Sequence, residues 1–448
     1  MADKKKKTTV GFVSLGCPKN RLDTEVMLKE LIDAGYEITG EEIEADIIII
    51  NTCAFIESAK KESIDNILDI AWLKQKKLRG IIVTGCLSER YRDEIFKELP
   101  EVDAVLGVGS LHDIAAAVAA VDRGEKYSSY KPKDEVALGG ERVVTTPDGW
   151  AYLKIAEGCD NCCSYCAIPS IRGHFRSRPM EELVAEAKGM EELGVKELTL
   201  VAQDTSRYGY DFDGSYHLAE LIRAITDATN IPWIRLLYCY PDKITEQLIS
   251  EFKSNPRLLP YIDLPIQHIN DRILGAMNRH GDSALIKEVI SKLRAEVPGI
   301  VIRTTAIVGF PGETEEEFEQ LCEFVKEAKF ERFGAFPYSA EEGTSAALLP
   351  DQIDEQVKQD RCDVIMKLQM GISEQYNEKM LGKTVELLCE GYDPVSEMHY
   401  GRSAADAPEI DGKIYFSASS PKKRFAEGQM IKVRITDTLD YDLIGEAL

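Results

Sequence analysis

The sequence predicts an α/β protein with an N-terminal doubly wound parallel sheet, a central partial (βα) barrel with six βα units, and a small all-β barrel at the C-terminus. Two observations predict this fold. Short apolar strands alternate with helical stretches through most of the 448 residues, which is typical of parallel sheets. From Leu381 onward, short strands follow one another with turns between them, as in a small barrel. The expected domains are residues 1–135, 145–375 and 380–448.

Four strand–helix units account for the N-terminal sheet. Its strands are expected at Val10–Leu15, Asp46–Asn51, Gly80–Thr84 and Val102–Gly107. Four consecutive isoleucines in the second strand suit a parallel strand that is buried on both faces. From Arg123 to Gly149 the periodicity gives way to Gly, Pro, Ser, Thr and charged residues. This composition indicates a linker with an edge hairpin.

The central and C-terminal strands follow from the same patterns. Six strands of the partial barrel are expected at Ala151–Ala156, Glu197–Val201, Trp233–Tyr238, Tyr261–Leu264, Val301–Gly309 and Arg332–Phe336. A long polar helix over Asp351–Met380 closes this part. The C-terminal strands are expected at Thr384–Glu390, Gly412–Phe416, Met430–Asp437 and Asp442–Ala447.

Composition and charge exclude several classes of protein. With 44% hydrophobic and 29% charged residues, the chain is of ordinary globular composition. It has no apolar run long enough for a membrane span and no secretory leader, so we expect it in the cytoplasm. Eleven cysteines in that reducing compartment indicate metal binding or catalysis rather than disulfides. The net charge of −23 argues against a duplex nucleic acid. It favours a basic partner or, equally, an acidic surface that simply keeps the protein soluble.

The sharpest motif is C-x3-C-x2-C, formed by Cys159, Cys163 and Cys166 directly after the first strand of the central barrel. Three thiolates so close together can hold one face of an iron–sulfur cube and leave the fourth iron without a protein ligand. A zinc site that includes His174, or a plain ferredoxin-like cluster, is the alternative. Cys162 could also pair with Cys159, but only the other three cysteines give this spacing. We therefore interpret Cys162 as a cysteine that is not a cluster ligand.

A second set of cysteines is spread over the N-terminal sheet. Cys17, Cys53 and Cys86 each follow the carboxyl end of a different predicted strand. These ends converge on one edge of a parallel sheet, where ligands bind. Gly16 and Gly85 precede two of the cysteines and allow the tight backbone that a close approach requires. A second three-thiolate cluster with an open iron is predicted.

The first motif, with Tyr165 before its last cysteine, resembles that of radical S-adenosylmethionine enzymes. Together with the second cysteine set and the C-terminal barrel, the whole chain resembles the methylthiotransferase family of these enzymes, in which the C-terminal barrel is a TRAM domain. The resemblance implies two 4Fe–4S clusters. One, on Cys159, Cys163 and Cys166, would cleave S-adenosylmethionine to a 5′-deoxyadenosyl radical. The other, on Cys17, Cys53 and Cys86, would carry the sulfur to be inserted, with S-adenosylmethionine also the methyl donor.

Further cofactor contacts are implied at the carboxyl ends of strands, where barrel active sites form. Tyr165 would lie near the adenine or serve only as a packing aromatic. Gln203 follows the second barrel strand. Gly309 and Gly312 end the fifth strand as a cofactor-cradling turn or a plain helix start. His268 is assigned no catalytic role.

Two features favour one branch of the family. The run from Ser14 to Asn20 resembles the RimO-type branch, which inserts a methylthio group at the β-carbon of an aspartate in ribosomal protein twelve of the small subunit. Residues 381–448 contain 8 Lys and Arg against 12 Asp and Glu, whereas a domain that grips tRNA should be basic. The basic run at Lys422–Arg424 is also compatible with a solvated turn.

The predicted partners are therefore a basic ribosomal protein and an external electron donor. The alternatives are a tRNA adenosine methylthiotransferase and a non-catalytic iron–sulfur factor associated with the ribosome.

Overall fold

The computed structural model describes residues 7–135, 138–418 and 424–448. The chain divides into two compact units. The first takes its residues from Met1–Thr145, Glu157–Arg176 and Ser339–Ala347, and the second from Thr146–Ala156, Ser177–Tyr338 and Leu348–Leu448. The segment with Cys159, Cys163 and Cys166 thus belongs to the unit of the N-terminal sheet.

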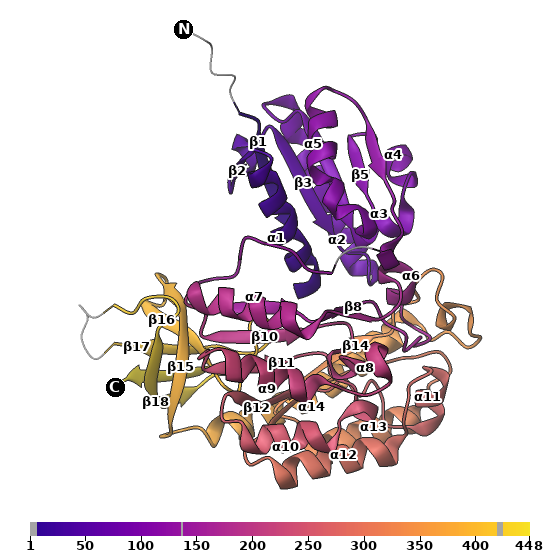
Figure 1. The fold of residues 1–448 in the computed structure, drawn as a ribbon. Helices are drawn as coiled ribbons and strands as arrows, with labels where there is room; N and C mark the ends of the chain where they lie inside the picture. Colours follow the sequence, from indigo (N-terminus) through magenta and orange to yellow (C-terminus); the bar gives the residue numbers. More distant parts are fainter. Residues whose placement is uncertain (1–6, 136–137, 419–423) are drawn as a thin grey trace. The chain divides into compact units, whose positions relative to one another are not determined.

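A six-stranded parallel sheet in the order β2-β1-β3-β4-β5-β6 forms the centre of the first unit (Figure 1). Its strands are β1 (Thr9–Ser14), β2 (Glu37–Thr39), β3 (Ile47–Thr52), β4 (Gly80–Gly85), β5 (Ala104–Leu106) and β6 (Tyr127–Ser129). The expected edge hairpin is wrong, because Tyr127 pairs in parallel with Ala104 and β6 simply extends the sheet. The strand order reverses between β1 and β3, which is the ligand-binding position of doubly wound sheets.

Helices cover both faces of this sheet, as predicted. On one face Ile47 and Ile49 pack with residues of α1 (Pro18–Asp33) and α5 (Ile114–Asp122). On the other face Ile48 and Ile50 pack with α2 (Glu57–Ala71), α3 (Cys86–Tyr91) and α4 (Glu94–Glu98). Successive residues of a strand point to opposite faces, so the run of isoleucines serves two cores.

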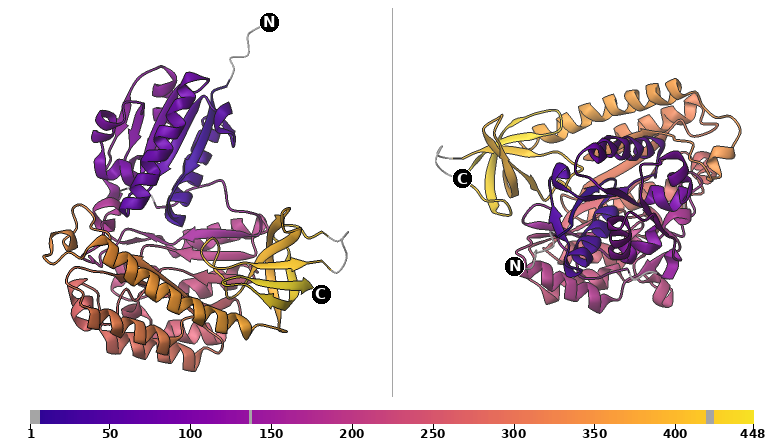
Figure 2. Two further views of the ribbon diagram at one scale, coloured as in Figure 1. Left: turned by 180° about the vertical axis from the view of Figure 1, so that it is seen from behind. Right: turned by 90° about the horizontal axis from the view of Figure 1, so that it is seen from above.

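The second unit contains the predicted partial barrel, with six parallel strands in the order β14-β13-β12-β11-β10-β7. The strands are β7 (Trp150–Lys154), β10 (Glu197–Val201), β11 (Trp233–Leu236), β12 (Leu258–Asp263), β13 (Val301–Val308) and β14 (Arg332–Pro337). Its helices are α7 (Met180–Glu192), α8 (Tyr210–Asp213), α9 (Leu218–Ala228), α10 (Glu246–Ser254), α11 (Asp271–Ala276), α12 (Ser283–Glu296) and α13 (Glu315–Ala328). Figure 2 shows the long α14 (Glu355–Glu378) leading into the small C-terminal barrel.

The C-terminal barrel is closed, in the order β15-β16-β17-β19-β18. Its strands are β15 (Thr384–Asp393), β16 (Met398–Ser403), β17 (Ile414–Ser417), β18 (Met430–Thr438) and β19 (Leu443–Ala447). The sequence patterns had not indicated β16. Lys422 and Lys423 of the predicted basic turn lie outside the described residues.

The C-terminal barrel is fixed to the amino ends of the central strands by buried charges. Glu197, the first residue of β10, lies 2.5 Å from Nε of Arg235 in β11 and 2.8 Å from Nη1 of Arg402 in β16. Arg235 also donates to the carbonyl of Ala404, and Tyr261 of β12 donates to Asp411 at 2.6 Å. These contacts join the two barrels within the second unit.

Within the described parts of the chain, no helix is both long enough and apolar enough to cross a membrane.

Short 3-10 helices occur at Glu42–Glu44, Trp72–Gln75, Val108–Asp113, Lys133–Glu135, Thr205–Arg207, Pro241–Lys243 and Ala346–Leu348.

Candidate cluster and cofactor site

Three cysteines follow strands that end at the carboxyl edge of the N-terminal sheet. Ser14 pairs with Asn51, and Thr52 with Gly85, so β1, β3 and β4 end side by side. Cys17 follows β1 and precedes α1, Cys53 follows β3, and Cys86 opens α3. Cys53 and Cys86 are buried, and Cys17 is partly exposed. The three strands therefore end side by side, as predicted, and the role of the three cysteines as ligands of one cluster stays a prediction.

The backbone around these thiols is held by buried amides and hydroxyls. Asn20 of α1 donates to the carbonyls of Leu15 and Thr52, at 3.1 and 2.9 Å. Ser63 of α2 accepts from the backbone N–H of Cys53 at 3.0 Å. Gly16 has φ +88°, and a Cβ there would lie 2.9 Å from Cβ and 3.2 Å from Sγ of Cys53. Only glycine lets the first cysteine loop approach the second so closely.

Burial keeps two of these thiols neutral when no cation is bound. It raises the pKa of Cys53, and it raises that of Cys86 to about 12. The charge of Arg172 opposes this rise at Cys86, whereas ionised Cys17 and Cys53 would add to it. A bound metal deprotonates a coordinating thiol outright. A metal centre bound there would therefore have to displace the thiol protons.

The second cysteine set lies in a loop between two short paired strands, β8 (Ala156–Glu157) and β9 (Arg176–Ser177). Cys159 and Cys163 are buried and Cys166 is partly buried, whereas Cys162 is exposed with φ +49°. Sγ of Cys166 accepts from the backbone N–H of Ile168 at 3.5 Å. The three cysteines with the predicted spacing therefore differ from Cys162 in their environment. Tyr165 is half-buried in the same loop.

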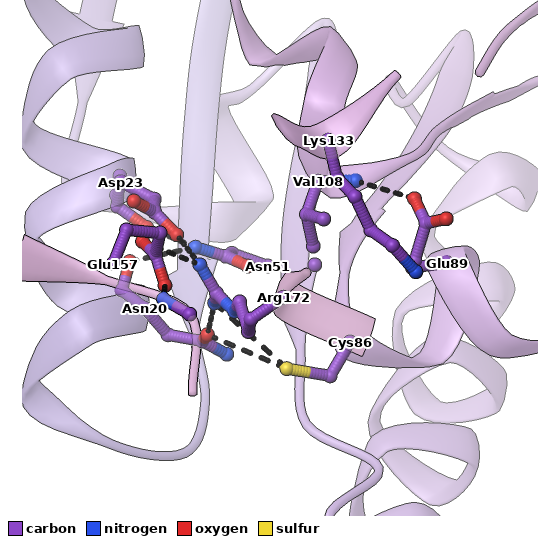
Figure 3. Close-up of polar contacts among 12 residues, drawn as sticks. Asn20, Asp23, Asn51, Cys86, Glu89, Val108, Lys133, Glu157 and Arg172 are labelled. Carbon is purple, nitrogen blue, oxygen red and sulfur yellow. Dashed lines mark hydrogen bonds and ion pairs between the residues drawn. The ribbon is translucent and has the colours of Figure 1, made fainter. Parts of the chain in front are cut away.

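Arg172 connects the two cysteine sets within the first unit (Figure 3). It ends α6 (Ile168–Arg172), the helix that follows the cysteine loop. Its Nη2 lies 3.8 Å from Sγ of Cys86 and donates to Oδ1 of Asn20. Its Nη1 lies 2.6 Å from Oδ2 of Asp23 and 3.4 Å from Oε2 of Glu157. A side chain from one cysteine segment thus contacts a thiol of the other.

A third segment of the chain also contacts both cysteine loops. Arg90 of α3 donates to the carbonyl of Ala54, next to Cys53, at 2.7 Å, and pairs with Glu341 at 3.1 Å. A few residues further on, the backbone N–H of Ala346 donates to the carbonyl of Ser164, next to Cys163, at 2.8 Å. The segment 339–347 therefore links the two loops a second time.

The remaining predicted cofactor residues lie in the second unit, at the carboxyl ends of its strands. Gln203 follows β10 and is partly buried. Gly309 and Gly312 follow β13 with φ +70° and +74°. A Cβ on Gly309 would lie 2.4 Å from Cγ of Lys358, whereas on Gly312 the nearest atom would be Nη1 of Arg272 at 3.8 Å. The two glycines differ, because a Cβ on Gly309 would overlap Lys358 of α14, whereas a Cβ on Gly312 would make only an ordinary contact with Arg272.

Two buried titratable groups lie near this turn. Burial raises the pKa of Glu313 to about 7, although Arg361 opposes this. Burial also lowers the pKa of His268 to about 4. Nδ1 of His268 accepts from the backbone N–H of Asn270 at 3.0 Å, so the ring is neutral and structurally engaged. Across residues 7–135, 138–418 and 424–448, no three His, Cys, Asp or Glu side chains converge on a position for a single metal ion.

Three family models match successive parts of the chain. Residues 9–107 match the uncharacterized protein family UPF0004, residues 153–325 match the radical SAM superfamily, and residues 381–448 match the TRAM domain. The resemblance drawn from the cysteine motif and from the C-terminal strands is confirmed by these matches.

Curated relatives match the chain from end to end. The ribosomal protein uS12 methylthiotransferase RimO of Thermoanaerobacter sp. (strain X514) is 49% identical over 98% of this chain and 99% of its own length. The protein of the same name from Geobacter sulfurreducens is 48% identical over 99% of both chains. This chain belongs to the ribosomal protein uS12 methylthiotransferase family. Membership, with the radical SAM match, makes it a radical S-adenosylmethionine enzyme with a 4Fe–4S cluster.

Solved structures share the fold of this methylthiotransferase at low identity. The radical S-adenosylmethionine methyltransferase TsrM from Kitasatospora setae superposes with a TM-score of 0.54 at 14% identity, over 74% of this chain and 75% of that chain. The cobalamin-dependent S-adenosylmethionine radical enzyme OxsB gives 0.50 at 14% identity, over 81% and 56%. These likenesses support the fold alone.

Sequence reasoning missed several residues that organise the methylthiotransferase site. Asn20 ends the run that carries the branch resemblance, but nothing in the sequence indicated that it meets Arg172. Arg90 and Glu341 gave no signal, since they are 251 positions apart.

Proposed function

We propose that this chain inserts a methylthio group at the β-carbon of an aspartate in ribosomal protein uS12 by radical C–H activation. One observation carries the proposal above the others. Two sets of three cysteines lie in one compact unit, in a chain that matches uS12 methylthiotransferases over its whole length. Replacement of an unactivated C–H bond by C–S has no acid–base route, which is why radical chemistry is needed.

Two 4Fe–4S clusters are proposed, one on each cysteine set. Two observations support these sites. Both contain buried thiols, and the backbone of Gly16 lies so close to Cys53 that only a glycine fits there. When bound, the clusters supply the electron that cleaves S-adenosylmethionine and the site that carries the sulfur. Three cysteines of the chain would hold each cluster, and the fourth iron would then have no protein ligand. Cys162, which is exposed, is proposed to bind neither cluster.

S-adenosylmethionine is proposed to contact Tyr165, Gln203, Gly309 and Gly312. The last three residues lie at the carboxyl ends of parallel strands, where barrel enzymes bind their substrates. Gly312 is less crowded than Gly309, since a Cβ there would meet only Nη1 of Arg272 at 3.8 Å, and this supports a cofactor contact at its backbone. Gly309 must be a glycine to make room for Lys358, whether or not a cofactor binds. Its proposed contact with the cofactor is therefore one of the backbone.

The charge of the chain supports a protein substrate over tRNA. The whole chain carries −23, and residues 381–448 contain fewer basic than acidic side chains. Such a surface attracts a cationic ribosomal protein and repels phosphates. Modification of a ribosomal protein places the reaction in the cytoplasm, and an external one-electron donor is proposed to reduce the clusters.

Anaerobic reconstitution and incubation with uS12 test this function. We expect about eight iron atoms per chain, four for each cluster, release of 5′-deoxyadenosine, and a uS12 mass increased by one methylthio group in place of hydrogen. The modification on a tRNA nucleoside instead would assign the chain to the tRNA branch. Absence of 5′-deoxyadenosine would leave only a non-catalytic iron–sulfur factor.

A further inference from the structure

The guanidinium of Arg172 lies directly against the N-terminal thiol set, although Arg172 comes from the segment that carries the other cysteines. Its Nη2 faces Sγ of Cys86 at 3.8 Å. Arg172, Cys86 and Asp23 are each only 4% exposed. A hydrogen bond between such buried groups is electrostatically stronger than the same bond in water. A cluster bound by Cys86 would therefore interact strongly with the positive charge of Arg172.

The partners of Arg172 hold the guanidinium in one orientation. Asp23 and Glu157 accept from Nη1 at 2.6 and 3.4 Å, and Oδ1 of Asn20 accepts from Nη2. Asn20 is itself fixed, because its Nδ2 donates to the carbonyls of Leu15 and Thr52. An N–H of Arg172 is thereby directed at the sulfur of Cys86 (Figure 3).

The charges around Arg172 argue against a binding site for a free anion. Two buried carboxylates, Asp23 and Glu157, already face the single positive charge of the guanidinium. A free anion bound there would lie beside both carboxylates, which repel it. The role left for Arg172 is toward the thiolate itself, as a fixed hydrogen-bond donor.

Hydrogen bonds to ligand sulfurs and the net charge nearby set the reduction potential of an iron–sulfur cluster. A donor or cation beside the ligand stabilises the reduced form, which carries one more negative charge. A carboxylate at the same place destabilises that form. Arg172 and Asp23 should therefore move the potential in opposite directions.

We propose that Arg172 is a positioning residue that raises the reduction potential of the cluster bound by Cys17, Cys53 and Cys86, with Asp23 opposing it. This inference rests on the proposed function, because it requires the N-terminal cluster. It does not concern the cluster of Cys159, Cys163 and Cys166.

Redox titration of the reconstituted holoenzyme, followed by electron paramagnetic resonance, tests the proposal. Addition of S-adenosylmethionine perturbs the signal of the radical cluster and so assigns the two signals. In Arg172→Gln we expect the ratio of reduced to oxidised N-terminal cluster, at the wild-type midpoint, to fall at least tenfold, equivalent to about 59 mV. In Asp23→Asn the ratio should rise, and Arg172→Lys should lie between wild type and Arg172→Gln.

Glu25→Gln provides the matched control. Glu25 lies on the same helix as Asp23 and is likewise buried in an ion pair, with Arg142. Its other side-chain contacts are with Thr145, not with a thiol. Loss of the Glu25–Arg142 pair should leave the reduction potentials of both clusters unchanged. The control therefore distinguishes an effect of charge beside Cys86 from a general loss of stability.

Unchanged potentials in Arg172→Gln and Asp23→Asn proteins with about eight irons would overturn the proposal, as would shifts of the same sign or an equal shift in Glu25→Gln. If Arg172→Gln fails to retain iron, the potentials of Asp23→Asn and Arg172→Lys test the proposal instead. A higher potential in the first and a lower one in the second would support it, and unchanged potentials would overturn it. A wild-type protein with about four irons would instead refute the N-terminal cluster itself, and the inference with it.

Discussion

Arg90 and Glu341 form a buried ion pair across 251 positions of the chain, with 3.1 Å between Nη1 and Oε2. Their side chains are 8% and 4% exposed. The guanidinium also donates to the carbonyls of Ala54 and Glu342. The pair therefore joins the loop after Cys53 to the segment that contacts the cysteine loop at Ser164.

Replacement of Glu341 by Gln should destabilise the first unit. A buried guanidinium that loses its counter-charge costs about 3–5 kcal/mol of unfolding free energy. Urea unfolding of the apoprotein, followed by labelling of the buried thiols Cys53 and Cys86, measures the loss in this unit. Glu57→Gln is the control, because Glu57 pairs with Lys60 on an exposed surface and should cost under about 1 kcal/mol. Equal effects would contradict the structural role of the pair.

The two cysteine sets should separate functionally. Cys159→Ala is expected to abolish 5′-deoxyadenosine formation. Cys17→Ala should retain 5′-deoxyadenosine release, hold about half the iron and fail to transfer the methylthio group. Chromatography of the nucleoside and mass spectrometry of uS12 measure both steps. Full methylthiolation by Cys17→Ala would disprove the sulfur-carrying role of the N-terminal set.

Cys162→Ser serves as the matched control for the cysteine variants. Cys162 is exposed while Cys159 and Cys163 on either side are buried. We expect wild-type iron content and product yield, because an exposed thiol outside both cysteine sets binds neither cluster. Loss of half the iron would show instead that Cys162 is a cluster ligand.

His268 should make the stability of the second unit depend on pH. Burial lowers its pKa from 6.5 to about 4, so the unfolded chain takes up the proton first. The contribution of His268 is therefore complete above pH 6.5 and is lost as the pH falls toward 4. This loss amounts to about 3 kcal/mol of unfolding free energy.

Urea unfolding followed by the fluorescence of the buried Trp150 and Trp233 measures this dependence. His268→Asn should flatten the profile between pH 4 and 6.5, and His280→Asn, at an exposed position, should not. A wild-type profile in His268→Asn would show that this ring is not the titrating group.

Glu197→Gln should loosen the C-terminal barrel from the central one. Although burial opposes it, Arg235 and Arg402 hold the pKa of Glu197 below its ordinary value. Loss of the carboxylate would remove the counter-charge of buried Arg235, while Arg402 keeps Glu390, at a cost of about 3–5 kcal/mol. Tryptophan fluorescence during denaturation measures the change. Glu446→Gln, in an exposed pair with Arg434, should cost under about 1 kcal/mol.

The sequence by itself determined the fold class, the family and most elements of regular structure. Apolar periodicity is local, so β10 was predicted at the bounds that the structure shows, and the isoleucine run was correctly interpreted as a strand buried on both faces. Local patterns failed for β2 and β6, each three residues long and half exposed. Such edge strands are held by pairing with a neighbour, which short-range periodicity does not report.

Only the tertiary structure decided how the two cysteine sets are connected. Strand-end placement was enough to gather Cys17, Cys53 and Cys86 at one edge. The contact of Arg172 with Asp23 spans 149 positions, and that of Arg90 with Glu341 spans more. Contacts at such separations depend on how complete elements pack, because a charge is buried without a large penalty only where the folded chain supplies its partner.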